Sequence, residues 1–360
     1  MNDKKNTSDE FVRLALLERI FADQENRCVN KVICGVGEMD DAALIEISPD
    51  YSLVITSDFV RGSGFYLFTL GHLNYFDVGY YLVTANVSDI AAMGARPCGA
   101  LNVVRYADSV TDAEFCEIMN GIRSAADEYE ITIVGGDIGG HSADVFAATV
   151  FGFMKTSQAL FRSRAQIGDR VCLTGTIGKP ITALLYFKSA KPLGFALSAD
   201  EEEEVLAAWK RPRARITEGV LLSTNRLANA CQDISDGLKA TILQMSAASD
   251  KGFKIYEERL PISEGTKKLA AFQNTTPAQI AMSASVDFEL LFTVPPGKIG
   301  ECKTTFAKAG LKCIEIGEIT VEKENTLVRS DGRVEPLPGV PWKQQTGDDY
   351  LKAIGQGNRE

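Results

Sequence analysis

The chain has 360 residues, of which 45% are hydrophobic and 24% are charged, as in soluble globular proteins. This length is more than one compact core usually holds, and it predicts two domains. The formal net charge of −10 argues against nucleic acid as the main partner, because binding a phosphate backbone needs a basic face.

The first half of the sequence alternates predicted helices and strands. Apolar residues at helical spacing predict an amphipathic helix over 11–21. Thr111 and Glu114 have the spacing of a capping box, which favours a helix start at that point. The stretch 145–154 is almost entirely apolar and is predicted to be a buried strand. The other predicted strands are 43–47, 52–57, 99–105 and 131–134, and the predicted helices are 76–93 and 111–128.

A polar stretch at 155–168 interrupts the apolar pattern and predicts a boundary between domains 1–155 and 156–360. The Pro-rich last 30 residues predict an extended tail. Each half mixes strands and helices in a similar order, so the predicted fold class is α/β (α+β) with two domains. In the second half, helices are predicted near 180–190, 215–230 and 237–249 and from 201 onward, with strands at 253–257, 288–294 and 312–320.

The eight cysteines are scattered, with no CxxC pair and no metal-ligand spacing. Most lie inside apolar runs, which favours buried, reduced thiols in a cytosolic protein. The N-terminus is polar and precedes no apolar run long enough for a signal peptide or a membrane span. We therefore expect a cytoplasmic protein with no membrane partner.

Familiar nucleotide and hydrolase motifs are absent. The segment nearest to a Walker A motif, 175–180, has the wrong spacing and a proline where the hydroxyl residue should be. No GxGxxG motif follows a predicted strand, and protein-kinase signatures and GxSxG are missing. His72 and His141 are the only histidines, and neither has an obvious partner for a zinc site or a catalytic triad.

Aspartates stand repeatedly just past short apolar runs. We expect these runs to be strands, so that several carboxylates gather at strand ends. Mg²⁺ takes a few carboxylate ligands and completes its shell with water and phosphate oxygens. The pattern therefore predicts an enzyme that handles a magnesium nucleotide. The aspartates concerned are Asp40, Asp41, Asp58, Asp89, Asp137, Asp233 and Asp236.

Four of the Asp-containing segments resemble the thiamine-phosphate kinases, within the aminoimidazole-ribotide-synthetase-like superfamily. The segments are 40–43, 86–95, 135–137 and 233–238, in that order, and the resemblance spans about residues 10–350. The resemblance implies a two-domain fold of that type in a homodimer, with the N-terminal domains of two chains forming an intersubunit β-barrel.

The resemblance also implies ATP as co-substrate and several Mg²⁺ ions near that interface. The implied metal-binding residues are Asp40, Thr56, Ser57, Asp58, Asp89, Asp137, Asp233 and Asp236, and the implied nucleotide-binding residues are Gly136, Asp137, Arg162 and Ser235. In the alternative interpretation Asp41 and Ser88 cap helices, Asp233 or Asp236 caps the helix near 237, and Arg162 is a surface linker residue. No general base is assigned.

The sequence departs from the family pattern where the phosphoryl acceptor should bind. Gly64 stands where a histidine is expected, and Val286 replaces an acid. These changes predict retained ATP chemistry with an altered small-molecule acceptor, and the alternative is an unchanged acceptor held by other side chains. An aromatic acceptor could stack on any of five residues, which are more often core or interface residues: Tyr66, Tyr80, Tyr81, Trp342 and Tyr350. The implied substrate-binding residues are Gly64, Asp287, Glu289, Trp342 and Tyr350.

Three functions follow from these patterns. The first is an ATP- and Mg²⁺-dependent kinase resembling thiamine-phosphate kinase. The second is an ATP-dependent synthetase of the same superfamily that activates an amide or carbonyl oxygen. The third is a nucleotide-binding regulator that has lost catalysis. Selenophosphate synthesis is disfavoured, because residues 1–30 hold no pair of reactive Cys and Lys.

Overall fold

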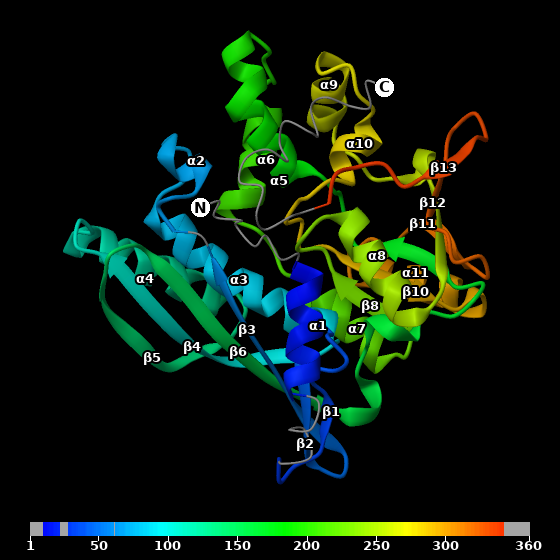
Figure 1. Ribbon diagram of the computed structural model, residues 1–360, viewed down its shortest axis with the longest axis horizontal. Helices are drawn as coiled ribbons and strands as arrows, with labels where there is room; N and C mark the ends of the chain where they lie inside the picture. The colour runs from blue at the N-terminus through cyan, green and yellow to red at the C-terminus, as the bar shows by residue number, and fades with distance from the viewer. Residues whose placement is uncertain (1–9, 22–27, 61, 342–360) are drawn as a thin grey trace, which may run out of the picture.

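The computed structural model describes residues 10–21, 28–60 and 62–341. Two mixed sheets form the framework: the first lies at the lower left of Figure 1 and the second at the right. Among the described residues, no helix is both long and apolar enough to cross a membrane. The two sheets draw their strands from either side of residue 155, and the domain boundary at that residue stays a prediction.

The first sheet has six strands in the order β1-β2-β3-β6-β4-β5. Neighbouring strands are antiparallel, except that the edge strand β5 runs parallel to β4. The strands are β1 (Val32–Cys34), β2 (Ala43–Ser48), β3 (Tyr51–Val60), β4 (Arg96–Ala107), β5 (Thr132–His141) and β6 (Val145–Lys155).

The second sheet has seven strands in the order β13-β12-β9-β11-β7-β10-β8, with only β12 and β9 parallel. The strands are β7 (Arg170–Leu173), β8 (Ala230–Asp233), β9 (Gly252–Tyr256), β10 (Leu290–Val294), β11 (Ile314–Thr320), β12 (Thr326–Val328) and β13 (Val334–Pro336). All residues of β8 and β10 are buried, as expected for strands covered on both faces.

Helix α3 (Tyr75–Ala92) connects the two halves. Its start is fixed by a capping box, in which the Asn74 side chain accepts from the Asp77 backbone and the Asp77 side chain accepts from that of Asn74. Nearly all of its residues are buried, because it packs against the first sheet, α4, α7 and β8. The other helices are α1 (Glu10–Phe21), α2 (Tyr66–Thr69), α4 (Asp112–Glu128), α5 (Lys179–Leu185), α6 (Ala199–Lys210), α7 (Ile216–Thr224), α8 (Leu238–Ser249), α9 (Glu264–Phe272), α10 (Pro277–Ala281) and α11 (Ile299–Lys308).

Strand β6 differs from the prediction of a fully buried strand. Its residues alternate between buried and more exposed: Phe146 is fully buried, whereas Phe153 is 49% exposed. The stretch reads as continuously apolar because its open face also carries large apolar side chains. The predicted tail contains the short strand β13, and Trp342 and Tyr350 lie outside the described residues.

Candidate functional site

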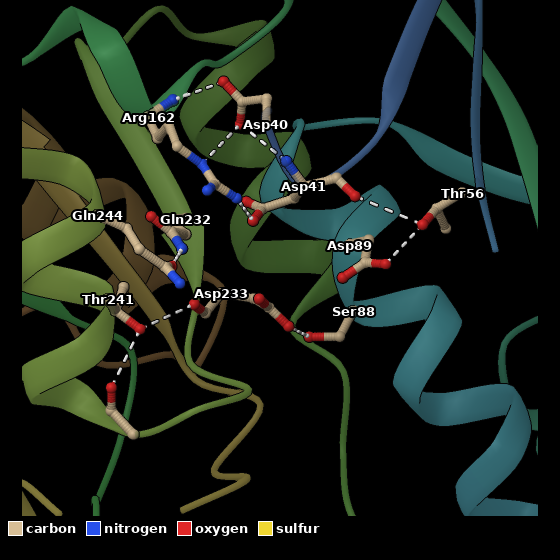
Figure 2. A network of polar contacts seen from close by, with 11 residues as sticks. Asp40, Asp41, Thr56, Ser88, Asp89, Arg162, Gln232, Asp233, Thr241 and Gln244 are labelled. Atoms are coloured by element: carbon tan, nitrogen blue, oxygen red, sulfur yellow. Dashed lines mark hydrogen bonds and ion pairs between the residues drawn. The ribbon is translucent and has the colours of Figure 1, made fainter. Parts of the chain in front are cut away.

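Acidic side chains from separate parts of the chain gather between the two halves (Figure 2). Asp40 and Asp41 lie in the segment between β1 and β2, Asp89 lies in the last turn of α3, and Asp233 ends β8. Each of these carboxyl groups is within electrostatic range of at least one other in the group. The fold therefore brings together residues that are up to 193 positions apart in sequence (40 to 233).

Arg162 neutralises one side of this group. Its backbone N–H donates to Asp40 Oδ2 at 3.0 Å, its Nε lies 3.5 Å from Asp40 Oδ1, and its Nη2 donates to Asp41 Oδ1. The Arg162 side chain is only 13% exposed, so it is not a surface linker residue. Asp41 Oδ2 is buried without a hydrogen-bond partner, and an unsatisfied buried acceptor is costly.

Two hydroxyl groups position the other two carboxylates. Thr56 Oγ1 donates to Asp89 Oδ2 at 2.7 Å, and Ser88 Oγ donates to Asp233 Oδ2 at 2.6 Å. Ser88 is thus not a helix cap: it lies inside α3 and joins the first half of the molecule to the second. The N-cap residue of helix α8 is Gly237, which has no side-chain capping bond, so neither Asp233 nor Asp236 occupies the N-cap position.

The electrostatic environment opposes the ionised form of these acids. Burial raises the pKa of the Asp89 carboxyl, and the charges of Asp233 and Asp41 raise it further. Burial raises the pKa of Asp233 to about 6, against the hydrogen bond from Ser88. Burial likewise raises the pKa of Asp41, and the charge of Arg162 only partly opposes this. Repelling acids in one place favour a bound cation.

The donor set fits Mg²⁺ carried by a phosphate compound. Within the described ranges, no three His, Cys, Asp or Glu side chains are arranged so that they could hold a metal ion by themselves. Mg²⁺ is commonly bound by one or two carboxylates together with water and substrate phosphates, rather than by an all-protein cage. The orphaned oxygen of Asp41 and the mutually repelling carboxyl groups of Asp89 and Asp233 fit such a donor set.

A cavity of about 560 Å³ opens beside the acidic group. Asp58, Ser235 and Asp236 line part of it and supply its polar groups near Asp233. Its other walls are aromatic and aliphatic, and are formed by Phe65, Tyr81, Leu184, Trp209, Val286 and Phe288, among others. The Tyr81 ring stacks on Trp209, with centroids 5.8 Å apart and planes 17° apart. A cavity with one acidic end and aromatic walls can hold a flat organic group next to bound phosphates.

Other predicted metal and nucleotide residues lie outside the buried group. Ser57 Oγ donates to the Ala148 backbone. Asp137, on strand β5, pairs with Arg105 of the neighbouring strand β4, and the Asp137 side chain is 62% exposed. Gly136 lies directly before Asp137 and packs against the backbone of Asn102. The roles proposed for Ser57, Gly136 and Asp137 stay predictions.

The predicted acceptor residues that the structure describes are not among those that line the cavity. Asp287 accepts from the Gly178 backbone at 2.7 Å, and Glu289 accepts from Thr174 at 2.6 Å and from Arg215. Their neighbours Val286 and Phe288 line the cavity instead. A side chain at Gly64 would meet nothing within 4 Å. The substrate roles of Asp287, Glu289 and Gly64 therefore stay predictions.

The expectation that the aspartates stand at strand ends is correct for Asp233 alone. Asp89 is helical, because its apolar run belongs to α3. Asp58 and Asp137 lie within strands β3 and β5 rather than after them, since the pleat continues past the apolar residues that marked each strand in the sequence.

Comparisons with known proteins agree with this architecture. Residues 39–154 match the family model "AIR synthase related protein, N-terminal domain", and residues 166–330 match "AIR synthase related protein, C-terminal domain". The thiamine-monophosphate kinase of Pyrococcus abyssi is 34% identical over 309 residues, which are 86% of this chain and 90% of that protein. The chain belongs to the thiamine-monophosphate kinase family. The family member from Escherichia coli K12 is 30% identical over 86% of this chain and 90% of its own length.

Solved structures of the family have the same fold. A structure of thiamine-monophosphate kinase from Stenotrophomonas maltophilia has a TM-score of 0.70 at 28% identity, covering 89% of this chain and 96% of that one. A solved complex titled "AaThiL complexed with AMPPCP and TMP" has a TM-score of 0.76 at 24% identity, covering 96% of this chain and 99% of that one. The two-domain AIR-synthase-like fold expected from the sequence is thus confirmed.

Sequence reasoning missed several residues of the site in this family member. Asp41 and Ser88 each had a helix cap as the alternative role, yet their partners are Arg162 and Asp233. Trp209 was not singled out, because it lies in a helix recognised only by its acidic start. Its one available signal was rarity, since the sequence has only two tryptophans.

The buried carboxyl group of Asp287 is expected to make the free energy of unfolding depend on pH. Burial, together with the charge of Glu289, raises its pKa from 3.8 to about 7, despite the hydrogen bond from Gly178. The folded protein therefore keeps a proton that the unfolded chain loses near pH 4. This contribution is complete below about pH 4 and is lost as the pH rises toward 7, by at most about 1.4 kcal/mol per pH unit.

We expect Asp287→Asn to make the free energy of unfolding less dependent on pH between 4 and 7. Urea unfolding at several pH values measures this slope. Asp108→Asn, at an exposed residue, is the control and should keep the slope of the unmodified chain. Equal slopes in all three proteins would show that Asp287 titrates normally.

Proposed function

We propose that the protein is an ATP- and Mg²⁺-dependent kinase that transfers the γ-phosphoryl group to thiamine phosphate and yields ADP and thiamine diphosphate. One observation carries the proposal: the buried group of Asp40, Asp41, Asp89 and Asp233 lies beside a cavity with aromatic walls. Family membership agrees with it, and the relative with TM-score 0.76 was solved with AMPPCP and TMP.

The chain's own residues would act by positioning and charge. Asp89 and Asp233, with Asp58 at the cavity, would hold Mg²⁺, and Thr56 and Ser88 fix two of these carboxylates by hydrogen bonds. When bound, Mg²⁺ would supply charge neutralisation to the phosphates. Phosphoryl transfer needs little else beyond in-line positioning. Anionic phosphates do not approach bare carboxylates, so the cation must mediate.

Arg162 is placed to respond to the nucleotide. In this structure it is held by Asp40 and Asp41. An arginine binds phosphate oxygens through its planar fork of donors. We propose that this guanidinium, held beside the acidic group, is the chain's own donor to the nucleotide.

The aromatic cavity is the proposed acceptor site. Tyr81, Trp209 and Phe288 offer flat apolar surfaces, which suit a heteroaromatic substrate and attract a cationic ring. Val286 lines the same cavity where family members carry an acid, so the site has less negative charge on that wall. This difference leaves a changed acceptor as the competing proposal for the same chemistry.

A turnover assay separates these possibilities. Purified protein is incubated with labelled ATP, Mg²⁺ and thiamine phosphate, and the products are separated by chromatography. We expect ADP and thiamine diphosphate in equal amounts, and no product in EDTA. ADP with free phosphate and a condensed product would indicate a synthetase instead. ATP binding by calorimetry without turnover on any acceptor of a panel would indicate a regulator.

We further propose that two copies associate through the open face of the first sheet. This face carries exposed apolar side chains, among them Leu101, Val103 and Phe153. Contiguous exposed apolar surface of this kind marks an interaction site. The occupant is a second copy, because the resemblance implies an intersubunit barrel between the N-terminal domains of two chains, and this sheet lies in that domain.

Light scattering after size-exclusion chromatography tests the dimer. We expect a mass near twice 39.1 kDa for the unmodified chain and near 39.1 kDa for Val103→Asp, since a buried charge disfavours the interface. Val321→Asp changes an exposed residue after β11, in the second half, and should leave the dimer intact. A monomeric unmodified chain at micromolar concentration would contradict the proposal.

A further inference from the structure

Three thiols meet in the second half of the molecule, outside the site described above. Cys172 lies on β7, Cys302 lies on α11, and Cys313 precedes β11. Cys302 Sγ donates to Cys313 Sγ at 3.7 Å. The Cys172 thiol donates to the Arg170 carbonyl oxygen at 3.9 Å and lies close enough to Cys313 to lower the pKa of that thiol. All three are free thiols. Cys172 and Cys302 are buried, whereas Cys313 is partly exposed, so a small reagent can reach the shared acceptor.

The surroundings of Cys313 favour its thiolate. Hydrogen bonds from Cys172 and Cys302 lower the pKa of Cys313, and the charge of Lys303 lowers it further, against burial and the charge of Glu315. Lys303 pairs with Glu315 at 2.9 Å, which keeps its ammonium group beside the three sulfurs. The thiolate is the reactive form of cysteine, so Cys313 has the activated sulfur and Cys302 has an adjacent thiol.

Other buried cysteines of the chain lack this environment. Cys34 and Cys231 lie near the acidic site, where burial and the charges of neighbouring aspartates raise the pKa of both thiols. A raised pKa keeps such thiols protonated. The pKa of Cys302 is also raised, but mainly by its hydrogen bond to Cys313 and only then by burial, so oxidation of Cys313 removes the larger cause. The contrast shows that burial alone does not create the arrangement around Cys313: it depends on two thiol donors and one lysine.

We propose that Cys313 is a peroxide-reactive thiol whose oxidised form is resolved by Cys302 into a disulfide between α11 and β11. The Cys313 thiolate attacks one oxygen of hydrogen peroxide, the O–O bond breaks, and the leaving hydroxide takes a proton to become water. Cys313 is then a sulfenic acid. The Cys302 sulfur attacks the Cys313 sulfur, the S–O bond breaks, and the hydroxide leaves as water with the thiol proton.

The balance is two thiols and one peroxide giving one disulfide and two waters. The two sulfurs must approach from 3.7 Å to about 2.05 Å, which side-chain rotation and small shifts of the chain end at Cys313 can supply. Cys172 also lies near Cys313 and is the alternative resolving thiol. The bond would tie α11 to the first residues of β11, a strand in the middle of the second sheet.

Mass spectrometry of the full-length protein tests this directly. Trypsin places Cys302 on peptide 299–303 and Cys313 on peptide 313–323, so the disulfide appears as a linked pair of peptides. After substoichiometric hydrogen peroxide at neutral pH, we expect Cys313 to be oxidised at least fivefold faster than the exposed Cys116. An ordinary thiol such as Cys116 is only a few per cent ionised at neutral pH, so its thiolate fraction is about 30-fold smaller than that of a fully ionised Cys313. The lower nucleophilicity of an acidic thiol and the partial burial of Cys313 reduce that advantage.

Two variants assign the roles. Cys302→Ser should abolish the linked pair and raise the yield of a dimedone adduct at Cys313 at least threefold, because the sulfenic acid has lost its first partner. Cys116→Ser should change neither. Free Cys313 at a peroxide dose that oxidises Cys116 would overturn the proposal, as would an unchanged dimedone yield in Cys302→Ser. Circular dichroism of each variant verifies the fold, and the measurement on the unmodified chain does not depend on any substitution.

Discussion

Asp89→Asn is expected to lower kcat about a thousandfold while making the nucleotide-free protein more stable. The substitution keeps the shape of the side chain and an oxygen that can accept from Thr56. It removes one of several negative charges that repel each other when no cation is bound. A thousandfold loss corresponds to about 4 kcal/mol of transition-state stabilisation, which is reasonable for a charge that holds the metal on the transferred phosphate.

The prediction is specific because kcat should fall while the stability of the nucleotide-free protein should rise. Kinetics at saturating ATP and Mg²⁺ give kcat, and thermal unfolding in EDTA gives the change in Tm. The unmodified protein should gain stability on adding Mg²⁺ and ATP, whereas Asp89→Asn should gain little. Asp233→Asn, on the other half of the molecule, should behave alike, and the exposed Asp127→Asn should match the unmodified protein. Activity within threefold of normal in Asp89→Asn would rule out a metal role for that residue.

Gly121→Ala is expected to destabilise the fold by about 3 kcal/mol. A Cβ atom at this position would lie 2.0 Å from the Phe76 carbonyl oxygen and 2.9 Å from the Tyr80 nitrogen. Gly79 makes the reciprocal contact, since its Cβ would lie 2.2 Å from the Ile118 oxygen. Both clashes are with backbone atoms, so no side-chain rotation relieves them and α4 must move away from α3.

A matched substitution separates packing from helix propensity. Gly300 lies in α11, and a Cβ there would meet nothing within 4 Å. Gly300→Ala should therefore leave stability unchanged or raise it by up to about 1 kcal/mol. Urea unfolding at one pH measures both variants. If Gly121→Ala were within about 0.5 kcal/mol of the unmodified chain, the close approach of α3 and α4 would not be needed for the fold.

Local signals in the sequence were sufficient for much of the secondary structure. The capping box at Thr111 and Glu114 is present and begins α4 at the expected place, and the helix predicted over 76–93 is α3. Helices α9 and α11 were not predicted, because short helices with partly buried faces give weak periodicity. The capping box of α3 was missed because its members are Asn74 and Asp77, rather than the usual Ser or Thr with Glu.

The site was only partly accessible from the sequence. The resemblance marked Asp40, Asp89 and Asp233, and their electrostatic coupling agrees with a common location. It could not indicate that Arg162 neutralises Asp40 and Asp41, because that contact joins segments about 120 residues apart (41 to 162). Nor could it reveal the aromatic cavity, whose walls come from both halves of the chain. Such features depend on how the halves pack, which no local pattern encodes.

The division of the acidic group between the two halves has a consequence for biosynthesis. Domains generally fold as they leave the ribosome, with the N-terminal one first. The nascent chain releases Asp40, Asp41 and Asp89 before Arg162 has been translated, and Asp233 later still. A fragment ending at 155 would carry three of the four carboxylates and none of their arginine counter-charge, so the acidic group is completed only after Arg162 and Asp233 have been synthesised.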